Sequence, residues 1–220
     1  DVEDYRAVYL GGMRTLVAWL LNTKPRKFVY TSSTGVYGQE DGSWVDETSP
    51  TQPEAETGRV LIETERVALE AARGQNLPAV VLRLAGIYGP GRGHLLQQYL
   101  KGEAVLADQG QRLSNMIHRD DVAGCILAAC ERGRPGEIYN GVDDEPVTHL
   151  DFFRWLSHAL RRPMPPSTPQ PAEPHPKRGL TNKRVSNRKL KAELGYRFIS
   201  PTFREGYRSE LERLKASGTL

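Results

Sequence analysis

The chain has 220 residues, of which 38% are hydrophobic and 26% are charged, and its formal net charge is +3 at pH 7. This composition is ordinary for a globular protein with one sizeable domain, or one domain and a small lobe. The small net charge gives no electrostatic footprint for nucleic acid, no apolar run approaches the ~18 residues of a membrane span, and no signal-peptide pattern opens the chain.

The first predicted element is a helix over 4–21, where Asp4 can cap the first turn and apolar residues recur at helical spacing. A doubly wound α/β domain normally begins with a strand, and its first turn carries a glycine-rich phosphate loop. No such glycine pattern occurs in this chain. We therefore expect at least two βα units, roughly 60 residues, to lie upstream. A naturally truncated protein is the alternative.

Residues 27–38 begin as a short apolar run rich in β-formers and pass directly into hydroxyl residues and two glycines. In an open parallel sheet, ligands bind just outside the carboxyl ends of the strands. Thr31, Ser32 and Ser33 are therefore candidates for a site. The alternative is that they only satisfy backbone groups in a loop.

A polar, proline-containing surface loop over 39–56 precedes an amphipathic helix over 56–73. Residues 78–88 form a nearly continuous apolar run, which predicts a strand covered on both faces. The elements expected next are a helix over 94–102, a strand over 116–119, a helix over 122–130 capped by Asp120 and Asp121, a strand over 137–142 and a helix over 150–160 capped by Thr148.

Residues 162–176 are rich in proline, which predicts an extended surface connection; a ligand for a proline-binding domain is the less favoured reading. Ser186 is expected to cap a helix over 189–194 that stops at Gly195, and a final helix runs from about 200 to 214.

Two cysteines, Cys125 and Cys130, lie five residues apart in a helical pattern. Their side chains point in different directions and cannot easily bridge, so we interpret both as structural thiols. This fits a reducing compartment, and we expect the protein to be cytoplasmic.

Four segments, taken together and in order, resemble the signature of the extended short-chain dehydrogenase/reductase family, the NAD-dependent sugar-nucleotide epimerases and dehydratases. The segments are Ser32-Ser33-x-x-Val36-Tyr37-Gly38, Leu82 to Pro90, Ile117 to Ala123 and Gly136 to Asn140. The resemblance extends from about Val8 to the C-terminus.

The resemblance implies an α/β fold, namely the C-terminal portion of a Rossmann-like parallel sheet with a small, mostly helical C-terminal lobe. The expected division is 1–147 for the NAD(P)-binding part and 148–220 for the lobe, to which 86–115 also contributes. NAD or NADP is the implied cofactor, and the implied partner is a small-molecule substrate such as a nucleotide sugar. Neither nucleic acid nor membrane is expected as a partner. A homodimer through the helices over 4–21 and 56–73 is a further implication.

The resemblance also implies site residues. Ser33 aligns with the catalytic serine or threonine that hydrogen-bonds the reacting hydroxyl. The implied cofactor-binding residues are Thr31, Ser32, Leu84, Ala85 and Gly86. The implied substrate-binding residues are Thr34, Tyr37, Tyr88 and His118, although a structural role for His118 is rated equal. No metal site is expected, because the acidic run Asp143-Asp144-Glu145 is better explained as a turn before a helix.

One feature departs from the family pattern. Family members carry Tyr-x-x-x-Lys at the start of the helix over 56–73, where the lysine lowers the tyrosine pKa for proton exchange. Here Thr57 stands at the tyrosine position and Leu61 at the lysine position. Three hypotheses follow: an atypical oxidoreductase with an unusual proton relay, a non-catalytic NAD(P)- or ligand-binding protein, and an inactive truncated chain.

Overall fold

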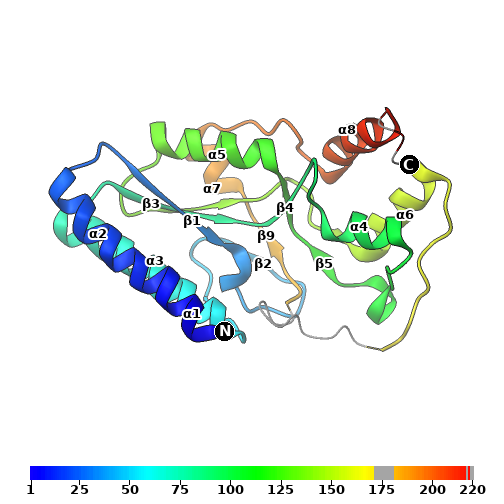
Figure 1. Cartoon of the computed structure of the whole chain (residues 1–220), viewed down its shortest axis with the longest axis horizontal. Coiled ribbons are helices and arrows are strands. Elements are labelled where there is room, and N and C mark those ends of the chain that lie inside the picture. The colour runs from blue at the N-terminus through cyan, green and yellow to red at the C-terminus, as the bar shows by residue number, and fades with distance from the viewer. Residues whose placement is uncertain (171–180, 217, 219–220) are drawn as a thin grey trace.

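The computed structural model describes residues 1–170, 181–216 and 218. Its central sheet contains three parallel strands in the order β1 (Phe28–Ser33), β3 (Ala79–Leu84) and β7 (Ile138–Gly141), of which Figure 1 labels β1 and β3. Every residue of β3 is buried, as the apolar run predicts for a strand covered on both faces. The alternation of strands and helices around this sheet confirms the α/β prediction.

Helices cover both faces of the sheet (Figure 1). On one face lie α3 (Glu56–Gln75) and a helix made of α1 (Val2–Arg6), a π segment (Ala7–Gly11) and α2 (Gly12–Thr23). On the other face lie α5 (Arg119–Arg132) and α7 (Arg188–Leu194).

The first helix starts two residues earlier than the sequence predicts. Asp1 is its N-cap, because the Asp1 side chain accepts a hydrogen bond from the backbone N–H of Asp4. The expected capping role of Asp4 is therefore wrong, although Asp4 completes a capping box by contacting the backbone of Asp1.

The apolar run over 78–88 does not form one strand. The backbone turns at Ala85, and β4 (Gly86–Tyr88) leaves the central sheet to pair in parallel with β6 (Met116–His118). The Ala85 N–H donates to the carbonyl of Gly141 at 2.9 Å, and the Gly86 N–H donates to the carbonyl of Asn115 at 3.0 Å. Two small residues thus carry the chain from one sheet to the next.

The remaining helices, α4 (His94–Lys101), α6 (His149–Leu160) and α8 (Phe203–Ala216), gather at the other end of the molecule in Figure 1. Their core is rich in stacked and edge-to-face aromatic rings. These rings belong to Tyr88, Tyr99, Phe152, Phe153, Phe203 and Tyr207. The division at residue 147 stays a prediction; α7, which lies beyond it, packs against β7 and α5.

Short strand pairs and a turn complete the fold. β2 (Trp44–Val45) pairs with β9 (Arg184–Val185), and β5 (Leu113–Ser114) pairs with β8 (Val147–Thr148). A 3-10 turn covers Ala107–Gly110. Within the described residues, each helix is too short or too polar to cross a membrane.

Several predicted helix ends are confirmed and two are corrected. Thr148 caps α6 by accepting from the N–H of Asp151, and Gly195 ends α7 in the left-handed conformation. However, α5 begins at Arg119 with His118 as its cap, not Asp120 or Asp121. Similarly, the N-cap of α7 is Asn187, not Ser186. Of the proline-rich connection over 162–176, residues 171–176 lie outside the described part of the chain.

Candidate functional site

The carboxyl ends of the three central strands meet in one row. Ser33 of β1 lies opposite Leu84 of β3, which lies opposite Gly141 of β7. Ala85 and Gly86 follow directly, and Gly86 is exposed. The structure therefore brings the predicted catalytic serine and the predicted cofactor-binding residues Leu84, Ala85 and Gly86 to the same edge of the sheet, where ligands of open α/β sheets bind.

The Ser33 hydroxyl caps the turn that follows β1. Its Oγ accepts a hydrogen bond of 3.1 Å from the N–H of Gly35 and so caps the 3-10 turn Thr34–Val36. The hydroxyl hydrogen has no acceptor among the described residues. Because a hydroxyl both accepts and donates, Ser33 can cap the turn and still donate to a bound hydroxyl.

Side chains alternate between the two faces of β1, so Ser32 faces away from Thr31 and Ser33. Thr31 is exposed, whereas Ser32 is 7% exposed and donates to Glu65 Oε1 at 2.5 Å. The Ser32 side chain is thus used inside the protein. Any contact between Ser32 and a cofactor has to come from its backbone.

Glu65 and Arg83 form a buried ion pair behind the row of strand ends. Arg83 donates to Glu65 through Nε at 3.1 Å and through Nη2 at 2.7 Å, and the two side chains are 5% and 3% exposed. A charge this deeply buried needs a partner with good geometry, and each residue supplies it to the other. Arg83 is therefore part of the framework.

The same guanidinium reaches Tyr37 on the turn after β1. Arg83 Nη1 donates to Tyr37 Oη at 2.8 Å, and Tyr37 Oη donates to Asn140 Oδ1 at 3.0 Å. Burial raises the pKa of Tyr37, although the charge of Arg83 opposes this effect. The whole Tyr37 residue is 0% exposed and its carbonyl accepts from Lys183 Nζ at 2.8 Å, so Tyr37 supports the turn from inside the protein. Thr34, on the same turn, is 8% exposed.

The helix at which the sequence predicts Thr57 and Leu61 in place of a tyrosine–lysine pair is α3. Thr57 lies in the first turn of α3. Leu61, one turn later, is 7% exposed and packs in the same apolar cluster as Val36 and Tyr37. The Leu61 side chain thus fills core space and places no charge beside the strand ends.

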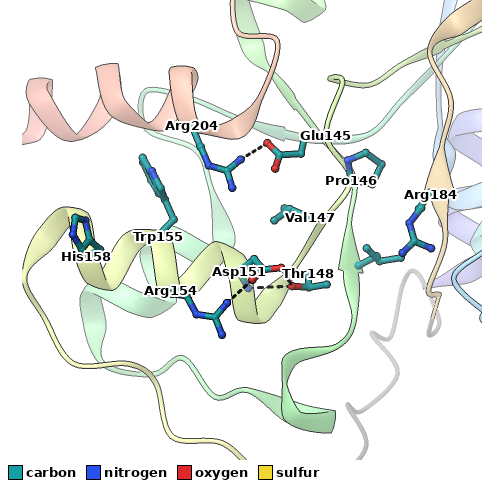
Figure 2. A pocket seen from close by; sticks show the side chains of 11 residues that line it. Glu145, Pro146, Val147, Thr148, Asp151, Arg154, Trp155, His158, Arg184 and Arg204 are labelled. Carbon is teal, nitrogen blue, oxygen red and sulfur yellow. Dashed lines mark hydrogen bonds and ion pairs between the residues drawn. The ribbon is translucent and has the colours of Figure 1, made fainter.

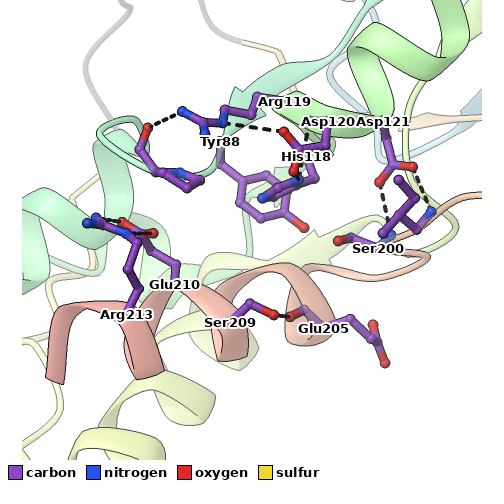
Figure 3. A network of polar contacts seen from close by, with 12 residues as sticks. Tyr88, His118, Arg119, Asp120, Asp121, Ser200, Glu205, Ser209, Glu210 and Arg213 are labelled. Atoms are coloured by element: carbon purple, nitrogen blue, oxygen red, sulfur yellow. Dashed lines mark hydrogen bonds and ion pairs between the residues drawn. The ribbon is translucent and has the colours of Figure 1, made fainter. Parts of the chain in front are cut away.

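Tyr88 and His118 are buried together at the junction with α8 (Figure 3). The His118 ring meets the Tyr88 ring edge to face at 5.3 Å, and its Nδ1 accepts from the N–H of Asp120 at 3.3 Å. Tyr88 also stacks on Tyr207 with 4.4 Å between ring centroids. Burial raises the pKa of Tyr88 far above its ordinary value, so its phenol stays neutral.

Asp121 ties the C-terminal segment to α5. Its carboxylate accepts from the N–H groups of Ile199 at 2.7 Å and Ser200 at 2.9 Å and from Tyr196 Oη at 2.8 Å, two of which Figure 3 displays around Ser200. In the described part of the chain, no three histidine, cysteine or acidic side chains are arranged to hold a metal ion.

Sequence reasoning missed Glu65, Asn140 and Lys183. Glu65 shares the apolar stripe of α3 with Leu61 and Ala68, and its partner Arg83 interrupts an apolar strand. One unpaired charge in each of two apolar stripes is a signal for a buried ion pair. Lys183 donates from Nζ to the carbonyl of Tyr37 at 2.8 Å, a contact between distant segments that no local pattern indicates.

A cavity of about 570 Å³ lies away from the strand ends (Figure 2). It is bordered by α6, β8 and the start of α8. Its charged side chains are largely neutralised, because Arg204 pairs with Glu145 and Arg154 pairs with Asp151 at 2.7 Å. None of the predicted site residues lines it.

Comparison with known proteins decides the family. The model of the NAD dependent epimerase/dehydratase family matches residues 1–140. The chain belongs to this family. The match covers β1, the Ser33 turn, α3, β3 and most of β7, which are the elements that build the row of strand ends.

Curated relatives are similar over part of their length. Protein YeeZ of Escherichia coli K12 is 36% identical over 135 residues, which are 60% of this chain and 45% of YeeZ. A 3-diazoavenalumate denitrifying reductase of a Streptomyces species is 29% identical over 69% of this chain and 52% of that protein. The chain spans about half the length of these relatives.

Solved structures are similar over nearly the whole chain. A conserved protein of unknown function from Silicibacter pomeroyi has 35% identity and a TM-score of 0.77, covering 96% of this chain and 73% of that one. The dTDP-glucose 4,6-dehydratase DesIV of Streptomyces venezuelae, solved with NAD and TYD, has a TM-score of 0.82 at 21% identity, covering 98% and 68%. The second likeness shows the shared fold.

Proposed function

We propose that this chain forms the substrate-facing edge of an NAD(P)-dependent oxidoreductase of the epimerase/dehydratase type, acting on a nucleotide sugar or a similar small molecule. The observation that carries the proposal is the row of strand ends, where Ser33 keeps a donor hydrogen next to Leu84 and Ala85. The NAD bound in DesIV and the family description support the same cofactor class for this chain.

Each predicted residue has a role in this proposal. Ser33 donates a hydrogen bond to the reacting hydroxyl and fixes its orientation. Thr31 and the backbone of Ser32, Leu84, Ala85 and Gly86 border the cofactor. NAD or NADP supplies the hydride acceptor when bound. Thr34, Tyr37, Tyr88 and His118 lie on the substrate side. The rings of Tyr37, Tyr88 and His118 are buried, so they act by supporting the backbone that contacts the substrate.

Proton transfer has to differ from the family pattern. Thr57 and Leu61 replace the tyrosine and lysine, and a threonine hydroxyl cannot serve as an acid or base near neutral pH. A water molecule held beside Ser33 is the relay that we propose. The buried phenol of Tyr37 is unsuited to the role because it is bound to Arg83 and Asn140.

Two alternatives remain open on the same fold. A non-catalytic NAD(P)- or ligand-binding protein is favoured by Leu61, whose side chain is committed to the core. An inactive truncated chain is favoured by the missing glycine-rich loop. Turnover distinguishes the oxidoreductase from the binding protein, and nucleotide binding distinguishes the binding protein from the truncated chain.

The experiment is a thermal-shift titration of the 220-residue chain with NADH and NADPH. A saturable rise in Tm is expected, since a ligand that binds only the folded state stabilises it. Gly86→Val should abolish the rise, because it adds a side chain at the exposed backbone edge. Gly74→Ala in α3, where a new Cβ meets no atom within 4 Å, should leave the rise unchanged. A cooperative melt without any shift would contradict nucleotide binding by these 220 residues.

Ser33→Ala separates catalysis from binding. Loss of the cap on the 34–36 turn should cost about 1 kcal/mol of unfolding free energy. The variant should keep the NADH-dependent rise in Tm and lose turnover of any nucleotide sugar that the unmodified protein oxidises. Unchanged turnover would remove Ser33 from the mechanism.

A homodimer through the first helix and α3 belongs to the same proposal. Val8, Tyr9 and Trp19 on the first helix are 69%, 39% and 59% exposed, an apolar surface that a second copy would cover. Sedimentation equilibrium should show a dimer, and Trp19→Glu should shift it to monomer. A monomeric parent chain would contradict this part. Cytoplasmic location stays a prediction.

A further inference from the structure

The turn that follows β7 is tied to the segment that leads into α8. The Asp143 N–H donates to the carbonyl of Met116 in β6 at 2.8 Å, and the Asp144 N–H donates to the carbonyl of Pro201 at 2.8 Å. Asn187, the N-cap of α7, donates from Nδ2 to the Asp143 carbonyl at 3.2 Å. These contacts place Asp143 where β6, β7, α7 and the start of α8 meet.

The Asp143 side chain is buried without a cation. The residue is 1% exposed, and its Oδ1 accepts one hydrogen bond, from the N–H of Glu145 at 3.2 Å. Its Oδ2 is buried and has no hydrogen-bond partner among the described residues. The ion pairs of this turn belong to its neighbours, because Asp144 pairs with Lys191 at 2.9 Å and Glu145 pairs with Arg204.

Asp121 shows what a buried carboxylate needs in order to keep its charge. It is 0% exposed and accepts three hydrogen bonds, from Tyr196 Oη at 2.8 Å and from the N–H groups of Ile199 at 2.7 Å and Ser200 at 2.9 Å (Figure 3). Asp143 accepts one long hydrogen bond instead. A buried carboxyl without a cation or enough donors is stable only as the neutral acid.

The titratable groups around Asp143 are acids and phenols. Burial raises the pKa of Asp143 well above its ordinary value, and the charges of the nearby carboxylates add to this effect. A neutral Asp143 adds no further negative charge to the cluster. The groups are Asp144 and Glu145 on the same turn, Asp121 on α5, Tyr88 on β4 and Tyr207 on α8.

We propose that Asp143 stays protonated in the folded chain at neutral pH and acts as a proton-dependent latch that holds α8 against β4 and β6. When α8 leaves its place, water reaches the carboxyl and the proton can dissociate. High pH therefore favours the opening of α8, and low pH opposes it. Because α8 carries Tyr207, which stacks on Tyr88 at 4.4 Å between ring centroids, opening uncovers Tyr88.

The sign of the effect follows from the two protonation states. An aspartate in water ionises near pH ~3.9, so between that pH and the higher pKa of the closed form only the opened form releases the proton. Each pH unit in this window multiplies the opening constant of α8 by up to about ten. Deuterium uptake by the α8 amides, corrected for the intrinsic exchange rate, measures this constant. From about pH 5 to about pH 8 it should rise at least about tenfold.

Asp143→Asn is the test variant, because its amide has the shape of the neutral acid and does not titrate. It should fold, and its α8 should have the same opening constant at both ends of the pH range. Asp144→Asn is the matched control on the same turn, since Asp144 is exposed and paired with Lys191. The control should keep the pH dependence of the unmodified chain.

An opening constant that does not change with pH in the unmodified chain, or an equal rise in Asp143→Asn, would overturn the proposal. The ¹³C chemical shift of the Asp143 carboxyl at neutral pH is a second readout that needs no variant. The shift of a neutral acid is expected, and the shift of a carboxylate would overturn the proposal. These measurements need no ligand, so a failure of NADH binding would contradict the proposed function and leave the latch unaffected.

Discussion

At the scale of single residues, the candidate site is supported by the buried ion pair of Glu65 and Arg83. Glu65 and Arg83 hold Ser32 and Tyr37 from behind, so the strand end that carries Ser33 rests on a fixed polar framework. The sequence predicts Ser33 at this edge, because a strand end followed by small hydroxyl residues is a local pattern. It does not predict that Ser32 and Tyr37 turn inward, because their partners come from α3, β3 and β7.

Arg83→Met should lower the unfolding free energy by about 3–5 kcal/mol, since it leaves the Glu65 carboxylate buried without its cation. Urea denaturation measures the change. The control is Arg66→Gln, which removes the exposed pair Arg66–Glu70 and should change stability by less than about 0.5 kcal/mol. Replacing Glu65 by Leu together with Arg83→Met should cost less than Arg83→Met alone. A loss below about 1 kcal/mol for Arg83→Met would contradict the framework role.

The pH dependence of stability should report His149. Burial, with the charge of Arg112, lowers its pKa from 6.5 to about 4 in the folded chain. Between these values the unfolded chain binds the proton and the folded chain does not, so the unfolding free energy falls as the pH falls from about 6.5 to about 4. Over this whole pH window, the unfolding free energy should fall by about 3 kcal/mol. The difference between the unmodified chain and His149→Gln, measured by urea denaturation across this window, should show that slope; parallel curves would contradict it.

At the scale of elements, the helices are largely predictable and the switch between sheets is not. Capping and apolar spacing place α3, α4, α6 and α8 to within a few residues. The split of the 78–88 run into β3 and β4 depends on pairing with β6, about thirty residues away, and the apolar pattern is the same on both sides of Ala85. The position of α8 against β4 and β6 is likewise a tertiary feature.

Alanine substitutions at two glycines, Gly206 in α8 and Gly74 in α3, test the packing of α8. A Cβ on Gly206 would lie 2.3 Å from Tyr88 Oη, and the Tyr88 ring is held between Tyr207 and His118. Gly206→Ala should therefore lower stability by about 1–3 kcal/mol. Gly74→Ala, at an open position of α3, should raise it by about 0.5–1 kcal/mol. Equal effects of the two substitutions in thermal melts would contradict the packing argument.

At the scale of the whole molecule, the fold class follows from the order of apolar runs and helical patterns, because parallel sheets need helical crossovers. The hydrogen bonds of Arg112 to Thr181 and of Asn115 to Lys183 do not follow from the sequence, since they join segments about seventy residues apart. The same holds for the cavity in Figure 2, which is built from α6, β8 and the start of α8. The family resemblance predicts a site at the strand ends, and the tertiary contacts bring Ser33, Leu84, Ala85 and Gly86 to that edge of the sheet.

The most direct test of the central claim is a titration of the ¹⁵N-labelled chain with NADH, followed by amide chemical shifts. The account predicts saturable shifts at the amides of Ser33, Gly35, Ala85 and Gly86, which lie along the row of strand ends. Shifts confined to α6 and α8, or no saturable shifts at millimolar NADH, would contradict it.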